Sequence, residues 1–193
     1  MVYGKGVRKM LEALKKRRAI RQFVDREVER EKIELLLEAA TYAPNDRMRE
    51  PWHFYVMQGD SLKGYEKVAL EFLEKRFPTK PHLVESSMKA ITNTPLIIAV
   101  TSAMVEGDEG ATKDNLFAVS SAIMSIWLMA EQLGLGMVWR TRGVGLVHDT
   151  ALHTYIGASH QEQLVGTLCI GYPAEEITTP KKRTPFSEKT TWL

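Results

Sequence analysis

The chain has 193 residues, of which 44% are hydrophobic and 26% charged, a length and composition typical of one globular domain with a core. Its formal net charge of +2 at pH 7 is too small to favour nucleic acid or a membrane surface as a partner. The sequence shows neither a signal peptide nor the run of about 20 apolar residues that a membrane span requires, so we expect a cytoplasmic protein.

The first half of the chain alternates helical and extended patterns. Apolar residues at helical spacing predict two helices, the second of which ends before Pro44. The aromatic and β-branched run from Trp52 predicts a strand, and two more helices are expected after it. The predicted ranges are helix 6–18, helix 30–42, strand 52–57, helix 60–76 and helix 83–92.

The second half contains the longest predicted helix, over 114–133, whose apolar residues cover more than one face. Such a helix is usually buried at the centre of the fold or packed against a partner chain. Because helices and strands alternate without a repeat, we expect one α/β-layered domain over residues 1–193. The other predicted elements are strand 96–100, a surface loop over 105–114, strand 137–140, a short helix near 148–156 and strand 164–170.

The tail over 174–193 shows little periodicity and ends on Trp192-Leu193. An exposed tail seldom needs a terminal tryptophan, because a large apolar side chain gains free energy from burial. We therefore expect the tail over 174–193 to pack on another surface, which a second subunit could provide.

Residue patterns for several common catalytic sites are missing. The histidines show no zinc-binding spacing and the single Cys169 excludes a thiolate cluster, so no metal site is expected. Cys169 lies in the apolar run LVGTLCIGY and is interpreted as a small buried hydrophobic residue rather than a reactive thiol. The sequence also lacks a Gly-x-Ser-x-Gly elbow and a phosphate-binding loop that ends in Gly-Lys-Ser/Thr. If the chain is an enzyme, a bound cofactor rather than a catalytic side chain carries the chemistry.

Two basic segments could bind an anion. The segment Lys16-Arg17-Arg18-Ala19-Ile20-Arg21 has four cations in six residues where a predicted helix ends. Arginine suits phosphate because its planar donor fork binds two oxygens at once. Favourable charge at the helix C-terminus is the alternative, but it accounts for only one or two of these cations. The second segment, Lys181-Lys182-Arg183, is interpreted by itself as a solvated charge run.

Several segments, taken in order, resemble the flavin-dependent nitroreductase family. Members of that family have a basic motif ending in Arg-x-Phe, a helix ending in Ala-Pro, a Pro-Trp-x-Phe strand, a Leu-Gly-Leu-Gly turn and a late Gly-Tyr-Pro. The resemblance is nearest to the family's short, YdjA-like branch and spans almost the whole chain. The matching segments are Arg17–Phe23, Ala43-Pro44, Pro51–Phe54, Gln132–Trp139, Gly171–Pro173 and the basic tail Lys181–Arg183.

The resemblance implies a fold, a cofactor and a reaction. The implied fold is α+β, with a central, mostly antiparallel mixed sheet flanked by helices, in an intertwined homodimer with FMN at the interface. The implied activity is oxidation of NADH or NADPH coupled to reduction of nitro compounds or similar small-molecule electron acceptors. In this two-step exchange the nicotinamide first reduces the flavin, and the acceptor then reoxidises it.

Site residues follow from the resemblance by position. Arg17, Arg18 and Arg21 would hold the FMN phosphate and ribityl chain, with Ala19 contributing its backbone, and Lys181 and Arg183 would meet the phosphate from the other side. Trp139, Arg140 and Thr141 would line the isoalloxazine, and Tyr42, Asp46 and Met48 would approach it from the partner subunit. The chain departs from the family pattern at Ala19, which replaces a serine, and at Met48 and Glu50, which replace side-chain amides.

Two other functions stay open. The same fold supports other flavin-driven oxidations and reductions, including dehalogenation. A non-catalytic binder of an anionic ligand or RNA is the third possibility, although the basic stretch lacks the interleaved aromatic residues typical of nucleic-acid sites apart from Phe23.

Overall fold

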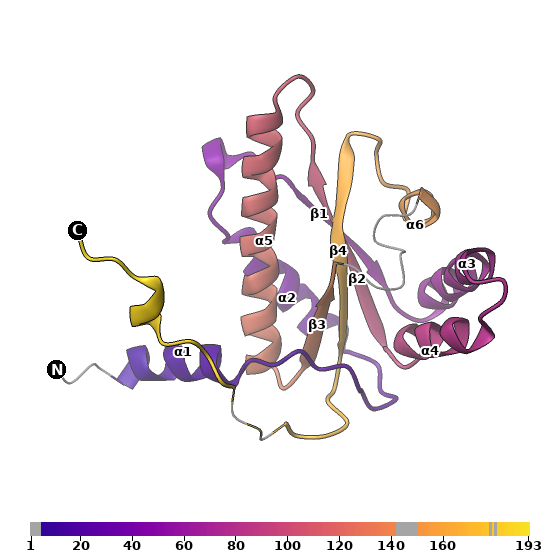
Figure 1. Ribbon diagram of the computed structural model, residues 1–193, viewed down its shortest axis with the longest axis horizontal. Coiled ribbons are helices and arrows are strands. Elements are labelled where there is room, and N and C mark those ends of the chain that lie inside the picture. The colour runs from indigo at the N-terminus through magenta and orange to yellow at the C-terminus, as the bar shows by residue number, and fades with distance from the viewer. Residues whose placement is uncertain (1–4, 142–149, 178, 180) are drawn as a thin grey trace.

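The computed structural model describes residues 5–141, 150–177, 179 and 181–193. These residues form three layers, in which a four-stranded sheet lies between helices on its two faces (Figure 1). The helices are α1 (Lys5–Lys16), α2 (Arg30–Thr41), α3 (Asp60–Arg76), α4 (Pro81–Thr92), α5 (Glu109–Gln132) and α6 (Thr150–Tyr155). The strands are β1 (Trp52–Met57), β2 (Leu96–Ala103), β3 (Gly136–Arg140) and β4 (Glu162–Gly171). Two short 3₁₀ turns, η1 (Asp46–Met48) and η3 (Phe186–Lys189), lie in the connecting segments.

The sheet has the strand order β1-β2-β4-β3, and each pair of neighbouring strands is antiparallel. Among the described residues, the parallel component is an isolated bridge between Ala19 and Met137 beside β3. The register shifts between Val100 and Thr101, where β2 pairs with β4. This topology confirms the α+β fold with a mostly antiparallel sheet flanked by helices.

Alternating strand residues build two separate cores, one on each face of the sheet. The first core joins α2 and α5 to one face of the sheet and includes Leu36, Ile98 and Ile126. The second joins α3, α4 and α6 to the opposite face and includes Cys169. Cys169 is only 1% exposed, which confirms its interpretation as a buried residue. Burial raises the pKa of its thiol, so the thiolate is disfavoured.

The predicted elements are confirmed, and the main error concerns the start of α5. The segment 105–114 was expected to be a loop, but α5 begins at Glu109. Asp108 explains the difference, because its side-chain Oδ1 accepts a hydrogen bond from the Ala111 N–H at 2.8 Å and caps the helix. β2 also continues to Ala103, beyond the predicted end at residue 100. Positions 148–149 of the predicted short helix lie outside the described residues, and α6 covers Thr150–Tyr155.

Several large apolar side chains are exposed to solvent in the single chain. Trp192, at the end of the tail, is 86% exposed, and Phe186 in the same tail is also exposed. Both side chains are therefore uncovered within one chain, and packing of the tail on a second subunit stays a prediction. Figure 1 shows α1 and the tail extending away from the sheet beside the lower end of α5. None of the helices in the described part of the chain is long and apolar enough to cross a membrane.

Candidate functional site

Four cations from the two ends of the sequence meet beside the C-terminal end of α1. Arg17 and Arg18 follow α1 directly, and Lys181 and Arg183 belong to the tail. Together with residues 14–16 they line a cavity of about 560 Å³. We refer to Arg17, Arg18, Lys181 and Arg183 as the basic cluster. The sequence grouped these residues only through the family resemblance, and the fold brings them together.

The charges of the basic cluster are not neutralised by neighbouring acids. Within the described part of the chain, none of the four forms an ion pair with a carboxylate. Burial, and then the charges of Arg183 and Arg18, lower the pKa of Arg17. Burial, and then the charges of Arg17, Arg18 and Arg183, likewise lower the pKa of Lys181. An anion in the cavity would relieve this repulsion, because an opposite charge favours the protonated forms.

Backbone carbonyls hold two of these cations in place. Nη1 of Arg18 donates to the carbonyls of Lys15, Lys16 and Arg17 at 2.6, 2.9 and 3.1 Å, and its Nη2 donates to Thr179 at 3.1 Å. The Lys181 ammonium also donates to the carbonyl of Arg17. The last carbonyls of a helix lack intrahelical partners, so Arg18 satisfies them. The helix-terminus interpretation thus applies to Arg18, while the cluster as a whole still presents unpaired positive charge.

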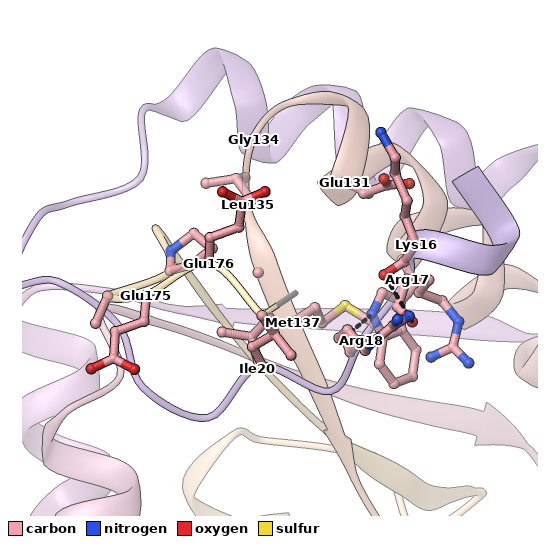
Figure 2. A pocket seen from close by; sticks show the side chains of 15 residues that line it. Lys16, Arg17, Arg18, Ile20, Glu131, Gly134, Leu135, Met137, Glu175 and Glu176 are labelled. Carbon is pink, nitrogen blue, oxygen red and sulfur yellow. Dashed lines mark hydrogen bonds between the residues drawn. The ribbon is translucent and has the colours of Figure 1, made fainter. Parts of the chain in front are cut away.

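Trp127 on α5 contacts Arg17 and Arg18, and the sequence alone did not predict this contact. The guanidinium carbon of Arg17 lies 4.2 Å from the centre of the Trp127 ring. The indole Nε1 donates to the carbonyl of Arg18 at 3.2 Å. Trp127 and Glu131 also line a second cavity of about 740 Å³, which shares Lys16, Arg17 and Arg18 with the first (Figure 2).

Ala19 and Arg21 follow the cluster along the edge of β3. Ala19 forms the parallel bridge with Met137, and the Ile20 N–H donates to the Met137 carbonyl at 3.1 Å. This pairing fixes the backbone of Ala19 and Ile20 along the edge of β3, next in sequence to Arg18 of the cluster. Arg21 is exposed, donates to the Ala19 carbonyl at 3.4 Å and does not line either cavity. Its proposed contact with the ribityl chain or phosphate therefore stays a prediction.

Trp139 and Arg140 project to opposite faces of the sheet. Trp139 packs on the first core, and its Nε1 is buried without a hydrogen-bond partner among the described residues. Nε of Arg140 donates to Sγ of Cys169 at 3.3 Å, in the second core. A planar ring against one face of β3 can therefore contact the side chain of only one of them. Thr141 is exposed at the end of β3, and the residues that follow it lie outside the described part.

Tyr42, Asp46 and Met48 lie in a different region, around η1. Tyr42 is 81% and Met48 76% exposed, and Oδ2 of Asp46 pairs with Nη2 of Arg49 at 3.0 Å. In Figure 1 this turn lies beside the upper half of α5, whereas the basic cluster lies near its lower end. One chain does not bring these three residues to the cluster.

The same turn has an unusual backbone. Three of its non-glycine residues, Arg47, Met48 and Glu50, have positive φ angles of 53°, 54° and 47°. The Glu50 N–H is held by Oδ1 of Asn45 at 3.0 Å. A left-handed conformation costs about 1–3 kcal/mol at a non-glycine residue and is concentrated at functional sites. The conformation is consistent with a turn that is shaped for contact with a ligand.

Comparisons with known proteins agree with this fold. YfhC of Bacillus subtilis (strain 168), named as an NAD(P)H nitroreductase, is 31% identical over 182 residues, which cover 92% of this chain and 91% of that protein. An iodotyrosine deiodinase of Hydra vulgaris is 24% identical over 188 residues, covering 89% of this chain and 68% of that protein.

Solved structures give the same result. A nitroreductase-like family protein from Bacillus cereus has a TM-score of 0.83 at 26% identity, covering 100% of this chain and 98% of that chain. A nitroreductase from Desulfovibrio desulfuricans, solved in complex with FMN, shares the fold with a TM-score of 0.74 at 20% identity over 100% of this chain and 98% of that chain. The model of the nitroreductase family matches residues 14–172, and the chain belongs to that family.

Proposed function

We propose that the protein is an FMN-dependent NAD(P)H oxidoreductase that reduces nitro compounds or similar small-molecule acceptors in a two-step exchange. Family membership and the name of the Bacillus subtilis relative support the reaction class. The FMN complex of the Desulfovibrio desulfuricans protein, which has the same fold, supports the cofactor. A cytoplasmic location stays a prediction from the sequence.

The basic cluster is the observation that carries this proposal. Its four cations have no carboxylate partner in the described part of the chain, and they line one cavity. A phosphate monoester carries between one and two negative charges near neutral pH and has several acceptor oxygens, so it fits this donor set.

When bound, FMN supplies the electron-transfer chemistry, and the chain's own residues bind and orient it. Arg17, Arg18, Lys181 and Arg183 would hold the phosphate, and Ala19 would present its backbone to the ribityl chain. Trp139 would pack against the ring system, with Thr141 near it, while Arg140 would act from the opposite face of β3. No side-chain nucleophile is needed for a reaction of this kind.

The proposed assembly is a homodimer with two sites. Tyr42, Asp46 and Met48 would contact the flavin from the second chain, because the turn η1 lies beside the upper half of α5 in Figure 1, whereas the basic cluster lies near its lower end. Several apolar side chains that lack cover in one chain support such an interface. They are Met10 and Leu11 of α1, Phe117 of α5, and Phe186 and Trp192 of the tail.

Reductive dehalogenation is the second candidate reaction, favoured by the similarity to the Hydra vulgaris iodotyrosine deiodinase. NADH or NADPH oxidation should be followed with the FMN-loaded protein and either a nitroaromatic or an iodinated phenol. Turnover with the nitroaromatic supports the first reaction, and iodide release without nitroaromatic turnover supports the second.

The cofactor proposal is tested by loading the purified chain with FMN, removing free flavin and then denaturing the protein. We expect release of one FMN per chain from a species that elutes as a dimer. A protein that retains no flavin would contradict the proposal. Strongly salt-dependent retention of RNA by such a flavin-free protein would instead favour the non-catalytic binder.

A further inference from the structure

Trp127 connects the central helix to the basic cluster through two independent contacts. Its ring lies under the Arg17 guanidinium at 4.2 Å, and its Nε1–H binds the Arg18 carbonyl at 3.2 Å. Resting on the proposed function, we propose that Trp127 is a positioning residue that holds Arg17 and Arg18 ready for the phosphate of FMN. The family motif includes the two arginines, but nothing in that motif includes Trp127.

The backbone of this segment needs such a support. α1 ends at Lys16; the Arg17 N–H still donates to the Ala13 carbonyl at 3.0 Å, whereas Arg18 lies beyond the last turn of the helix. Terminal segments fray unless other groups fix them. The carbonyl of Arg18 is fixed by Trp127 and that of Arg17 by Lys181. Trp127 itself belongs to α5, whose Ile123 and Ile126 are fully buried in the first core, so the support is rigid.

The side chain of Arg17 also needs support, because it lies among like charges. The charges of Arg183 and Arg18 oppose its own, which, after burial, is why its pKa is lowered. The face of an indole ring is negative and attracts a guanidinium. The ring of Trp127 therefore offsets part of the repulsion and restricts the rotamers of a flexible side chain before the ligand arrives. A group that is ordered in advance loses less entropy on binding.

This role predicts a phosphate-specific effect. Riboflavin has the ring system and the ribityl chain of FMN but no phosphate, so it does not use the basic cluster in the same way. Loss of the Trp127 contacts should weaken FMN binding by about tenfold, the order expected for one cation–π contact and one hydrogen bond. Binding of riboflavin should change by less than about twofold, because its contacts lie elsewhere.

Two variants separate the contacts of Trp127. Trp127→Leu removes both the ring face and the N–H donor. Trp127→Phe keeps a ring under Arg17 and loses only the hydrogen bond to Arg18, so it should recover part of the FMN affinity. Ile126→Val is the matched control, because it trims a fully buried neighbour on α5 that does not line either cavity. It tests whether a general loosening of the helix changes the ratio of FMN to riboflavin affinity.

The measurement is the dissociation constant of FMN and of riboflavin for the full chain and each variant, at one fixed low salt concentration. A selective loss of FMN affinity in Trp127→Leu, partly recovered in Trp127→Phe and absent in Ile126→Val, supports the proposal. Unchanged FMN binding in Trp127→Leu, or an equal loss for both flavins, overturns it. If Trp127→Leu does not fold, a selective FMN loss in Trp127→Phe supports the proposal, and unchanged binding there overturns it.

Failure of the proposed function is distinguishable from failure of this inference. A parent chain that binds neither flavin refutes the cofactor assignment, and inorganic pyrophosphate then serves as the probe. Pyrophosphate that raises the melting temperature of the parent but not that of Trp127→Leu supports the positioning role. An equal increase in both proteins, or no increase in either, refutes it.

Discussion

Arg183 and Lys182 are neighbours in the tail, but only Arg183 lines the cavity of the basic cluster. Replacing Arg183 by Gln should weaken FMN binding by tenfold or more, because a hydrogen bond to a charged group contributes about 1.5–3 kcal/mol. Lys182→Gln removes the same charge one residue away and should change the affinity by no more than about threefold, through long-range attraction alone. Titration of flavin fluorescence measures both. Equal losses in the two variants would show that only the net charge of the tail matters.

Glu162, the first residue of β4, forms a hydrogen-bond network that includes none of the residues of the basic cluster. Its carboxylate is 16% exposed and accepts bonds from the hydroxyl of Thr101, from that of Tyr55 at 3.0 Å and from the Ser159 N–H at 3.3 Å. Burial by itself would raise the pKa of Glu162, but these bonds outweigh it and lower the pKa. Burial, and then the hydrogen bond to Glu162, raise the pKa of Tyr55 to about 12.

The lowered pKa of Glu162 gives a pH dependence with a definite sign. A carboxyl group whose pKa is depressed by folding stabilises the folded state above its unfolded pKa, and this stabilisation is lost as the pH falls through the folded value. Glu162→Gln should therefore reduce the free energy of unfolding by about 1–2 kcal/mol near neutral pH, and the difference from the parent should shrink toward about pH 3. Urea unfolding across this range measures it. The exposed Glu71→Gln is the control, and a constant difference at every pH would contradict the network.

Residue-level signals in the sequence predicted part of the site and missed the rest. The density of arginine beside Phe23 indicated an anion site, and the strand period of two could have placed Trp139 and Arg140 on opposite faces. Trp127 looked like one more apolar residue of a buried helix. Its contact with Arg18 joins positions 109 residues apart, so no local pattern could reveal it.

At the scale of elements, the N-terminus of α5 depends on one side chain. Asp108 accepts the Ala111 N–H, and replacing such a cap by alanine costs about 0.5–2 kcal/mol. Asp108→Ala should lower the melting temperature by about 2–8 °C for a domain of this size. The exposed Asp114→Ala, farther along the same helix, should have a much smaller effect when measured at the same protein concentration. Equal decreases would mean that α5 does not depend on this cap.

Element positions were the most predictable feature, because period and breaker residues act locally. The strand over 52–57 was predicted with the bounds that the structure shows, and Pro78 ends the region of α3 as expected. The start of α5 was missed because Gly107, Asp108 and Gly110 together resemble a loop. The hydrogen bond that the Asp108 carboxylate accepts from the Ala111 N–H makes this segment the start of a helix. Strand order could not be predicted from local sequence patterns, because β2 pairs with β4 although α5 and β3 lie between them in the sequence.

At the scale of the whole molecule, α5 separates the two groups of predicted site residues. A helix of 24 residues spans about 36 Å, and the basic cluster and η1 lie beside its opposite halves. We therefore assign the proposed contacts of these two groups with one flavin to the two chains of the proposed homodimer. The exposed Trp192 at the end of the tail supports the same proposal, because a second chain could cover its ring. The sequence already pointed to such packing of the tail, but it did not show how far η1 lies from the basic cluster along α5.

The spectrum of the FMN-loaded protein during anaerobic titration with NADH and then NADPH tests the central claim most directly. We predict that the purified chain is yellow, that one of the two nicotinamides bleaches the flavin absorption with one equivalent per FMN, and that a nitroaromatic acceptor restores it. A colourless protein that takes up no FMN, or a bound flavin that neither nicotinamide reduces, would contradict the assignment as an NAD(P)H-dependent flavin oxidoreductase.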